Sequence, residues 1–240
     1  MSAVPETAMV LAAGLGTRMR PVTATLPKPL VPVCGRPLID HVLDRLAAIG
    51  VRRVVVNLHY KGELIERHLA ARRGIEIAFS REDHLLDTGG GVAAALALLG
   101  ETFFVVNSDV IWLDGKVSAL VRLARVFDPA RHDALLLLQR TVLAVGYDGS
   151  GDFMLDALGA LKRRTETEIT PYLFAGLQLL HRRLFEGAPE GAFSLKRLWD
   201  RAMAAGRIAG LLHDGEWFHV GSAAGLAATE VRLNTQRVER

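Results

Sequence analysis

The sequence holds little of what several protein classes require. Cysteine occurs once in 240 residues, at Cys34, which excludes an internal disulfide and any zinc site built from several cysteines. No apolar run approaches the ~20 residues that cross a bilayer. Residues 1–7 lack a basic segment followed by an apolar one, so no signal peptide is expected. These absences favour a cytoplasmic globular protein.

Acidic residues are missing from one stretch of the chain. Residues 7–39 contain no Asp or Glu but hold Arg18, Arg20, Lys28 and Arg36. The rest of the chain carries 25 basic and 26 acidic side chains, so the net charge of +3 originates in this stretch. Such concentrated positive charge is typical of a site that binds a polyanion. The sequence shows no basic helix face and no aromatic-basic pattern, so neither a nucleic acid nor a membrane is expected as a partner.

Strand and helix patterns alternate along the first half of the chain. Continuous apolar runs predict buried strands at 7–13, 53–58, 75–80, 102–107 and 133–139. Helical spacing predicts helices at 37–50, 61–70, 92–99 and 116–126. The second half loses this rhythm and predicts a hairpin at 152–163, strands at 171–180 and 208–213, and helices at 195–205 and 223–232. We therefore expect one α/β domain with a wound sheet.

A segment rich in glycine and proline follows the first predicted strand. It reads LAAGLGTRMR over 11–20 and LPKPL over 26–30. Glycines at 14 and 16 would let backbone N–H groups approach phosphate oxygens closely. The segment is not a Walker A loop, and Met19 stands where the Rossmann fingerprint needs a third small residue. Taken alone, the two glycines are equally consistent with an ordinary turn.

Two cations strengthen the phosphate-binding interpretation. Arg18 offers a bidentate donor fork just past the glycines, and Lys28 is a point charge held between two prolines. Each would interact with a charge ~4 Å away by about 4 kcal/mol at an effective dielectric near 20. Two such contacts on a migrating phosphoryl group would lower the barrier to its transfer.

The run LAAGLGTRMRPVT, followed by LPKPLVPVCGRPLI, closely resembles the signature of the sugar-1-phosphate nucleotidyltransferases. These enzymes join a nucleoside triphosphate to a sugar 1-phosphate and release pyrophosphate. The resemblance extends over about residues 8–230 and includes DTGGGV, VVNSDV, GDF and FAGLQLL. It implies a Rossmann-like, glycosyltransferase-A-type mixed sheet flanked by helices, with about 1–130 binding the nucleotide and about 131–240 the sugar. It also implies a Mg²⁺-dependent reaction.

The resemblance also assigns roles on the nucleotide side. The triphosphate would lie on the glycine-rich turn, at Leu11, Ala12, Ala13, Gly14, Gly16 and Thr17. Arg18 would hold the leaving phosphates, and Lys28 would contact those near the reacting centre. The strip facing the base would be Thr88, Gly89 and Gly90. An equally good interpretation of that strip is a helix N-terminus capped by Thr88 and packed through small residues.

On the acceptor side, the resemblance makes Asp109 a metal ligand and directs Asn107 to the sugar or the ribose. Gly151, Phe174 and Gly176 match acceptor-sugar positions, although Gly151 as a turn and Phe174 as core are competing interpretations of equal weight. The Glu-Lys-Pro of larger relatives is absent, so their sugar contacts cannot be transferred.

One departure concerns the metal. Relatives read W-x-D-V-G-T, with a second metal-binding aspartate, where this sequence has His219. Imidazole suits Mn²⁺ better than Mg²⁺. Three roles stay open: His219 binds the metal, it contacts phosphate as a cation, or Asp109 acts with water and phosphates only.

Within this family, the later segments are most similar to the members that transfer a uridylyl group from UTP to N-acetylmuramic acid 1-phosphate in peptidoglycan recycling. We expect that reaction here, catalysed by a monomer or homodimer. Guanylyl transfer to mannose 1-phosphate is the alternative within the class, because the amino-terminal motif is shared. A catalytically silent sugar-nucleotide sensor is the alternative of another class, suggested by His219. The length leaves no room for an appended β-helix or acyltransferase domain, so a single activity is expected.

Overall fold

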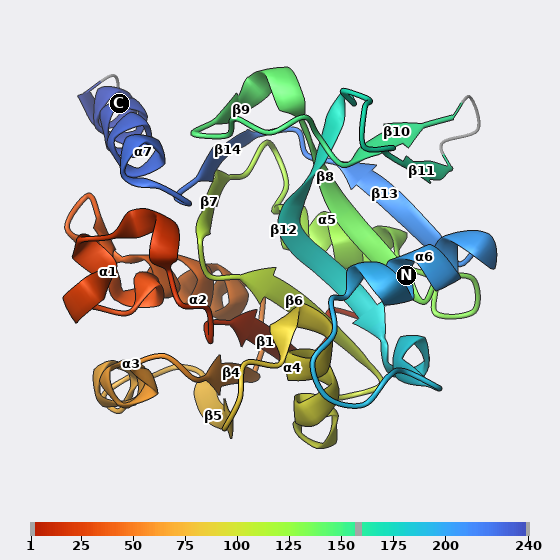
Figure 1. The fold of residues 1–240 in the computed structure, drawn as a ribbon, viewed down its shortest axis with the longest axis horizontal. Coiled ribbons are helices and arrows are strands. Elements are labelled where there is room, and N and C mark those ends of the chain that lie inside the picture. Colours follow the sequence, from red (N-terminus) through yellow and green to blue (C-terminus); the bar gives the residue numbers. More distant parts are fainter. Residues whose placement is uncertain (1–2, 157–159, 239–240) are drawn as a thin grey trace.

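A nine-stranded sheet forms the centre of the protein, which the computed structural model describes over residues 3–156 and 160–238 (Figure 1). The strand order is β11-β10-β12-β6-β1-β4-β5, while β8 pairs with β12 and β13 pairs with β8. The strands are β1 (Thr7–Leu11), β4 (Arg53–Leu58), β5 (Glu76–Arg81), β6 (Thr102–Asn107), β8 (Ala134–Arg140), β10 (Phe153–Leu155), β11 (Leu161–Arg163), β12 (Tyr172–His181) and β13 (Ile208–Leu212).

The first half of the chain supplies the parallel part of this sheet. β1 pairs in parallel with β4 on one side and β6 on the other, and β4 pairs with β5. Side chains on both faces of β1, β4 and β6 are buried, which explains their continuous apolar runs. The predicted strands at 53–58 and 102–107 are confirmed at the residue, and the predicted wound α/β class is confirmed with them.

The second half adds antiparallel strands. β12 runs antiparallel to both β6 and β8, so β8 points in the same direction as β6. The carboxyl ends of β1, β4, β6 and β8 therefore lie at one edge of the sheet. β12 is irregular between Phe174 and Gln178, where Gly176 has a φ of +78°. The predicted hairpin is present as β10 and β11, although residues 157–159 of its turn lie outside the described part of the chain.

Helices cover both faces of the sheet (Figure 1). One core packs under α2, α3 and α5, and the other under α4 and α6. The helices are α1 (Val22–Thr25), α2 (Leu38–Ala48), α3 (Gly62–Leu69), α4 (Asp87–Ala95), α5 (Ala119–Val126), α6 (Lys196–Ala204) and α7 (Ala223–Val238). Short 3₁₀ turns are η1 (Thr17–Met19), η2 (Lys28–Leu30), η3 (Leu96–Leu98), η4 (Thr141–Leu143) and η5 (Arg182–Phe185). Within 3–156 and 160–238, no helix has the length and hydropathy that a bilayer crossing requires.

A second, three-stranded sheet was not predicted. It has the order β7-β14-β9, formed by β7 (Val110–Leu113), β14 (Glu216–His219) and β9 (Ala144–Val145). Strands of two to four residues are too short for a periodic signal, and the same holds for the β2 (Pro32–Val33) and β3 (Arg36–Pro37) hairpin. A third core, which includes Met19, Ile111 and Phe218, packs between this sheet and α7.

The start of α4 differs from the prediction. The helix was expected from 92 with Thr88 as its cap, but it begins at Asp87 and contains three consecutive glycines. Tertiary packing explains this, because a Cβ at Gly91 would lie 2.8 Å from Glu82 Oε1. Low helix propensity at the glycines is outweighed by the close approach that they permit.

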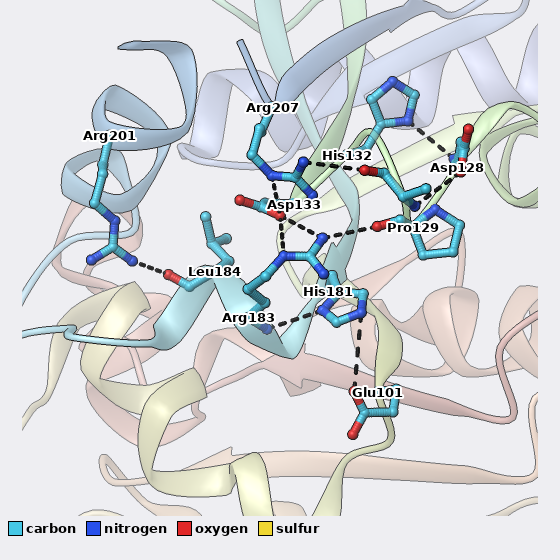
Figure 2. Close-up of polar contacts among 11 residues, drawn as sticks. Glu101, Asp128, Pro129, His132, Asp133, His181, Arg183, Leu184, Arg201 and Arg207 are labelled. Carbon is cyan, nitrogen blue, oxygen red and sulfur yellow. Dashed lines mark hydrogen bonds and ion pairs between the residues drawn. The ribbon is translucent and has the colours of Figure 1, made fainter. Parts of the chain in front are cut away.

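An ion cluster fastens the sheet at the edge opposite the carboxyl ends of β6 and β8 (Figure 2). Asp133, just before β8, accepts hydrogen bonds at Oδ1 from Nε of Arg183 and Nε of Arg207, each 2.9 Å long. The same arginines donate to the carbonyls of Pro129 and Ala130. These contacts join the loop before β8 to the segments after β12 and before β13.

Candidate active site

A cleft of about 540 Å³ opens at the carboxyl ends of β1, β4 and β6. Ligands of wound α/β sheets bind at this edge. The walls of the cleft are formed by Leu11, Ala12, Ala13, Gly14, Leu15, Gly16, Thr17, Arg18, Lys28, Pro29, Asn57, Glu82, Leu85, Asp87, Thr88, Asn107, Ser108, Asp109 and Gly221. The structure therefore gathers in one cavity every predicted nucleotide-side residue except Gly89 and Gly90, together with Asn107 and Asp109.

The glycine-rich turn forms the floor of the cleft next to β1. Gly16 has a φ of +64°, and a Cβ there would lie 3.0 Å from Cγ2 of Thr23. The Thr23 hydroxyl donates to the Gly16 carbonyl at 2.7 Å, which fixes the end of the turn. Among the described residues, the backbone N–H groups from Ala13 to Thr17 have no acceptor. They are therefore available to the oxygens of a phosphate.

The η1 turn decides which way the next side chains point. Met19 is buried at 1% exposure in the core beneath the turn, whereas Arg18 lines the cleft and is exposed. The residue that breaks the Rossmann fingerprint is thus an apolar anchor for the turn. Anchoring Met19 places the Arg18 guanidinium at the mouth of the cavity, where it faces solvent and any bound anion.

Lys28 and Asp109 form an ion pair across the cleft. Lys28 Nζ donates to Asp109 Oδ2 at 2.7 Å, and the side chains are 12% and 24% exposed. Burial alone would raise the pKa of Asp109, but the charge and hydrogen bond of Lys28 outweigh it, so this pKa lies below its ordinary value. Asp109 is thus held as a carboxylate. Its carbonyl accepts from Val220 N–H at 3.0 Å, which ties it to the end of β14.

His219 lies next to Asp109, although it is not among the residues that line the cleft. Its Nε2 lies 3.9 Å from Asp109 Oδ2. The imidazole stacks on Trp217, with ring planes 8° apart, and Gly221 leaves room for it, since a Cβ there would lie 2.2 Å from the ring. Burial lowers the pKa of His219, and the nearby cations Lys28 and Arg18 lower it further, against the raising effect of Asp109. The net effect favours the neutral imidazole, the form that can bind a metal ion.

Asp109 and His219 are the donors that a metal ion would meet here. Two ligands of one ion, with bonds near 2.1 Å, lie at most about 4.2 Å apart, and the 3.9 Å spacing falls within that limit. The described part of the chain holds no group of three or more His, Cys, Asp or Glu side chains placed to bind a metal. The pair therefore fits an ion that takes its remaining ligands from water and substrate phosphates, as Mg²⁺ usually does.

Sequence reasoning missed a buried polar chain behind the turn. Asn57 Oδ1 accepts from Ala12 N–H at 2.7 Å, and Asn57 Nδ2 donates to Glu82 Oε1 at 2.6 Å. Glu82 Oε2 in turn accepts from Leu86 N–H at 3.0 Å. The chain connects β1, β4 and the start of α4. Because Asn57 holds the Ala12 N–H, that predicted phosphate donor is already used. Asn57 is the polar residue near the end of an otherwise apolar buried run, a signal that could have revealed it.

Comparison with known proteins identifies the family. The sequence profile of the nucleotidyl transferase family matches residues 7–142, more than half of the chain. This chain belongs to the nucleotidyl transferase family. The N-acetylmuramate alpha-1-phosphate uridylyltransferase of Caulobacter vibrioides is 45% identical over 239 residues, which are 97% of this chain and 99% of that protein. The mannose-1-phosphate guanylyltransferase catalytic subunit beta of Danio rerio is 46% identical over 110 residues, which are 43% of this chain and 31% of that protein.

Solved structures agree on the fold of this nucleotidyltransferase. A crystal structure of UDP-glucose pyrophosphorylase complexed with UDP-glucose has a TM-score of 0.80 to it, covering 97% of this chain and 100% of that one at 17% identity. At this identity the likeness shows the fold alone. It confirms the predicted single-domain mixed sheet flanked by helices.

The three residues predicted to face the base do not all line the cleft of the transferase. Thr88 lines the cleft, and its Oγ1 accepts from Leu195 N–H at 3.0 Å. Gly89 and Gly90 both donate their N–H groups to the Phe193 carbonyl. A Cβ at Gly90 would lie 2.2 Å from the Gly191 carbonyl oxygen. These two glycines therefore pack against the loop before α6, in agreement with the packing interpretation.

The predicted acceptor residues extend from the cleft over the antiparallel half of the transferase. Gly176 sits at the irregularity of β12, where a Cβ would lie 3.2 Å from Cβ of Asn107. Phe174 is half-buried, with its ring edge-on to Trp199 at 4.9 Å between centroids. Gly151 has a φ of +78° and lies against Thr170. Gly176 thus lies beside the cleft, whereas Phe174 and Gly151 lie farther from it, near the beginning of β12.

Proposed function

We propose that this nucleotidyltransferase transfers a uridylyl group from UTP to N-acetylmuramic acid 1-phosphate, giving UDP-N-acetylmuramic acid and pyrophosphate. The observation that carries the proposal is the match along almost the entire chain to the Caulobacter vibrioides uridylyltransferase. The guanylyltransferase match from Danio rerio spans less than half of this chain. A match over 110 residues supports shared nucleotide-binding residues better than it supports a shared acceptor sugar.

The arrangement of the cleft supports a direct displacement. An oxygen of the sugar phosphate attacks the α-phosphorus and forms the new P–O bond. The bond from that phosphorus to the oxygen bridging to the β-phosphate breaks, and its electron pair leaves with pyrophosphate. The nucleophile is already an anion, so positioning and charge neutralisation suffice. We infer that about 1–130 hold the nucleotide, since every lining residue except Gly221 lies there, and that about 131–240 hold the acceptor.

We assign the charged residues of the cleft to separate parts of this reaction. The N–H groups from Ala13 to Thr17 cradle the triphosphate, and Arg18 neutralises the departing pyrophosphate. Lys28 has three donor protons, so it can hold Asp109 and reach a phosphate oxygen at the same time. Asp109 and His219 would hold a divalent cation, Mg²⁺ or, because of the imidazole, Mn²⁺. Such an ion supplies charge stabilisation to the phosphates when it is bound.

The decisive experiment measures pyrophosphate release by the purified protein from UTP and GTP, each combined with N-acetylmuramic acid 1-phosphate or mannose 1-phosphate. We expect turnover with UTP and the muramic acid derivative, at a kcat/KM at least about 100-fold above that of the other pairs. Faster release from GTP and mannose 1-phosphate would replace this proposal by the guanylyl alternative.

A matched pair of arginine variants tests the assignment of the cleft. Arg18 and Arg20 belong to the same acid-free stretch, and both are exposed, but only Arg18 lines the cavity. We expect Arg18→Gln to lower kcat/KM by about 100-fold and Arg20→Gln to change it less than about threefold. Equal losses in both variants would show a general effect of positive charge and would refute the specific role.

The sensor alternative is tested at His219. If the wild type binds UTP without turning it over while His219→Asp releases pyrophosphate, the protein is a sensor that has lost catalysis. We expect the wild type to be active, because Arg18, Lys28 and Asp109 all meet in the cleft.

A further inference from the structure

One segment next to the cleft has no role in the reaction as described so far. Residues 146–152 connect β9, which pairs with β14, to β10 on the acceptor side. In Figure 1, β9 and β14 lie side by side, and the chain passes from β9 toward β10. At the centre of this segment is the half-buried side chain of Tyr147.

The ring of Tyr147 contacts the metal side of the site. It lies edge-on to His219, with 6.2 Å between ring centroids and 62° between planes, and edge-on to Trp217 at 6.4 Å. His219 is therefore enclosed on two sides, by the stacked Trp217 and by the edge of Tyr147. These contacts set the orientation of a ring whose Nε2 faces Asp109.

The hydroxyl of Tyr147 contacts the acceptor side. It accepts a hydrogen bond from Gly151 N–H at 3.1 Å. Gly149 folds over the phenol, because a Cβ there would lie 2.4 Å from the hydroxyl oxygen. Gly151 is closely packed on its other side, where a Cβ would lie 2.4 Å from the Thr170 carbonyl oxygen. The loop thus packs closely against Tyr147, and the hydrogen bond to the phenol helps to fix the position of Gly151.

We propose that Tyr147 is a positioning residue that couples the metal-side imidazole of His219 to the acceptor loop at Gly151. The proposal rests on the proposed function, which places a divalent cation at Asp109 and His219 and the acceptor on about 131–240, the part of the chain that includes Gly151. A single aromatic side chain with two torsions contacts both groups, the imidazole through its ring and Gly151 through its hydroxyl. The ring and the hydroxyl act on different groups, and two substitutions separate them.

Tyr147→Phe removes only the hydroxyl, and Tyr147→Leu removes the ring as well. For Tyr147→Phe we expect the KM for the sugar 1-phosphate to rise roughly three- to tenfold, the range of one lost hydrogen bond, while the KM for UTP and the affinity for Mn²⁺ stay within twofold. For Tyr147→Leu we expect the same rise and, in addition, Mn²⁺ affinity weakened at least threefold, since His219 loses its edge contact.

Tyr60→Phe is the matched control. It also removes a tyrosine hydroxyl, which donates to the carbonyls of Thr23 and Ala24 on the nucleotide side, and it is expected to leave the KM for the sugar phosphate unchanged. Melting temperatures show whether each variant is folded. A purely structural role would lower the melting temperature and kcat of both Tyr147 variants without separating the two KM values or altering Mn²⁺ affinity.

The two proposals fail in different ways. If the wild type turns over and Tyr147→Phe has an unchanged KM for the sugar phosphate, the coupling is wrong and the function stands. If the wild type is inactive with every substrate pair, the function is wrong. Mn²⁺ binding, measured by electron paramagnetic resonance without substrate, still tests the contact with His219. Equal Mn²⁺ affinity in the wild type and Tyr147→Leu then overturns the coupling.

Discussion

The buried chain of polar groups behind the glycine-rich turn allows a quantitative test. Asn57 is 3% exposed, donates to Glu82 Oε1 at 2.6 Å and accepts from Ala12 N–H at 2.7 Å. The variant Asn57→Asp keeps the acceptor that faces Ala12 but replaces the donor that faces Glu82 by a second carboxyl oxygen. Two carboxylates at this separation cannot both be ionised in a buried site, so one of them must bind a proton.

The cost of this change depends on pH in a defined direction. The hydrogen bond lost to a charged acceptor contributes roughly 1.5–3 kcal/mol. A proton shared between the two carboxyl groups restores much of this hydrogen-bond energy. Keeping a carboxyl protonated in the folded state, however, costs about 1.4 kcal/mol of stability for each pH unit above roughly 4, where a free carboxyl titrates. The folded variant binds more protons than its unfolded chain, so its stability falls as pH rises. At this slope we expect a loss of about 1.4 kcal/mol at pH 5 and about 5.6 kcal/mol at pH 8.

Urea unfolding of the wild type, Asn57→Asp and Asn57→Leu at pH 5 and pH 8 gives the required free energies. The leucine variant leaves Glu82 Oε1 without this donor but adds no second carboxyl group, so its loss should depend on pH less steeply than that of Asn57→Asp. It also loses the acceptor for Ala12 N–H, and we expect its KM for UTP to rise more than that of Asn57→Asp. A loss in Asn57→Asp that is equal at the two pH values, or below about 0.5 kcal/mol at both, would refute the reasoning.

Two further predictions follow from the charges of the site and of the core. Lys28→Met should lower kcat by about 100-fold while tightening Mn²⁺ binding, because Lys28 no longer competes for Asp109 Oδ2; weaker Mn²⁺ binding, measured by titration, would contradict this. Burial lowers the pKa of His213 in the folded protein. Below about pH 6.5 the unfolded chain therefore binds a proton at this histidine more readily than the folded protein does, and wild-type stability falls as pH falls. In His213→Leu the change in unfolding free energy between pH 7.5 and 5.5 should shrink by roughly 1 kcal/mol, and parallel curves for the two proteins would exclude this contribution.

The sequence was most informative where local composition and burial agree. The apolar runs at 53–58 and 102–107 predicted β4 and β6 because strands covered on both faces need continuous apolar side chains. α4 was harder, because its three glycines disfavour a helix in isolation. Only the loop at 191–193 and the carboxylate of Glu82, which occupy the space that three Cβ atoms would need, explain why the helix includes them.

For the candidate site, too, local sequence signals predicted some features, whereas contacts between distant segments decided others. The absence of acids from 7–39, the two glycines of the turn and the cations Arg18 and Lys28 indicated a phosphate site from the sequence itself, since these properties belong to single residues and near neighbours. Lys28 and Asp109 pair across 81 positions of sequence, and His219 approaches the same carboxylate because β14 pairs with β7, the strand that follows Asp109. Contacts between distant segments, including Asn57 with Glu82 and Tyr147 with His219, arise from strand order and helix packing, and only the tertiary structure decided them.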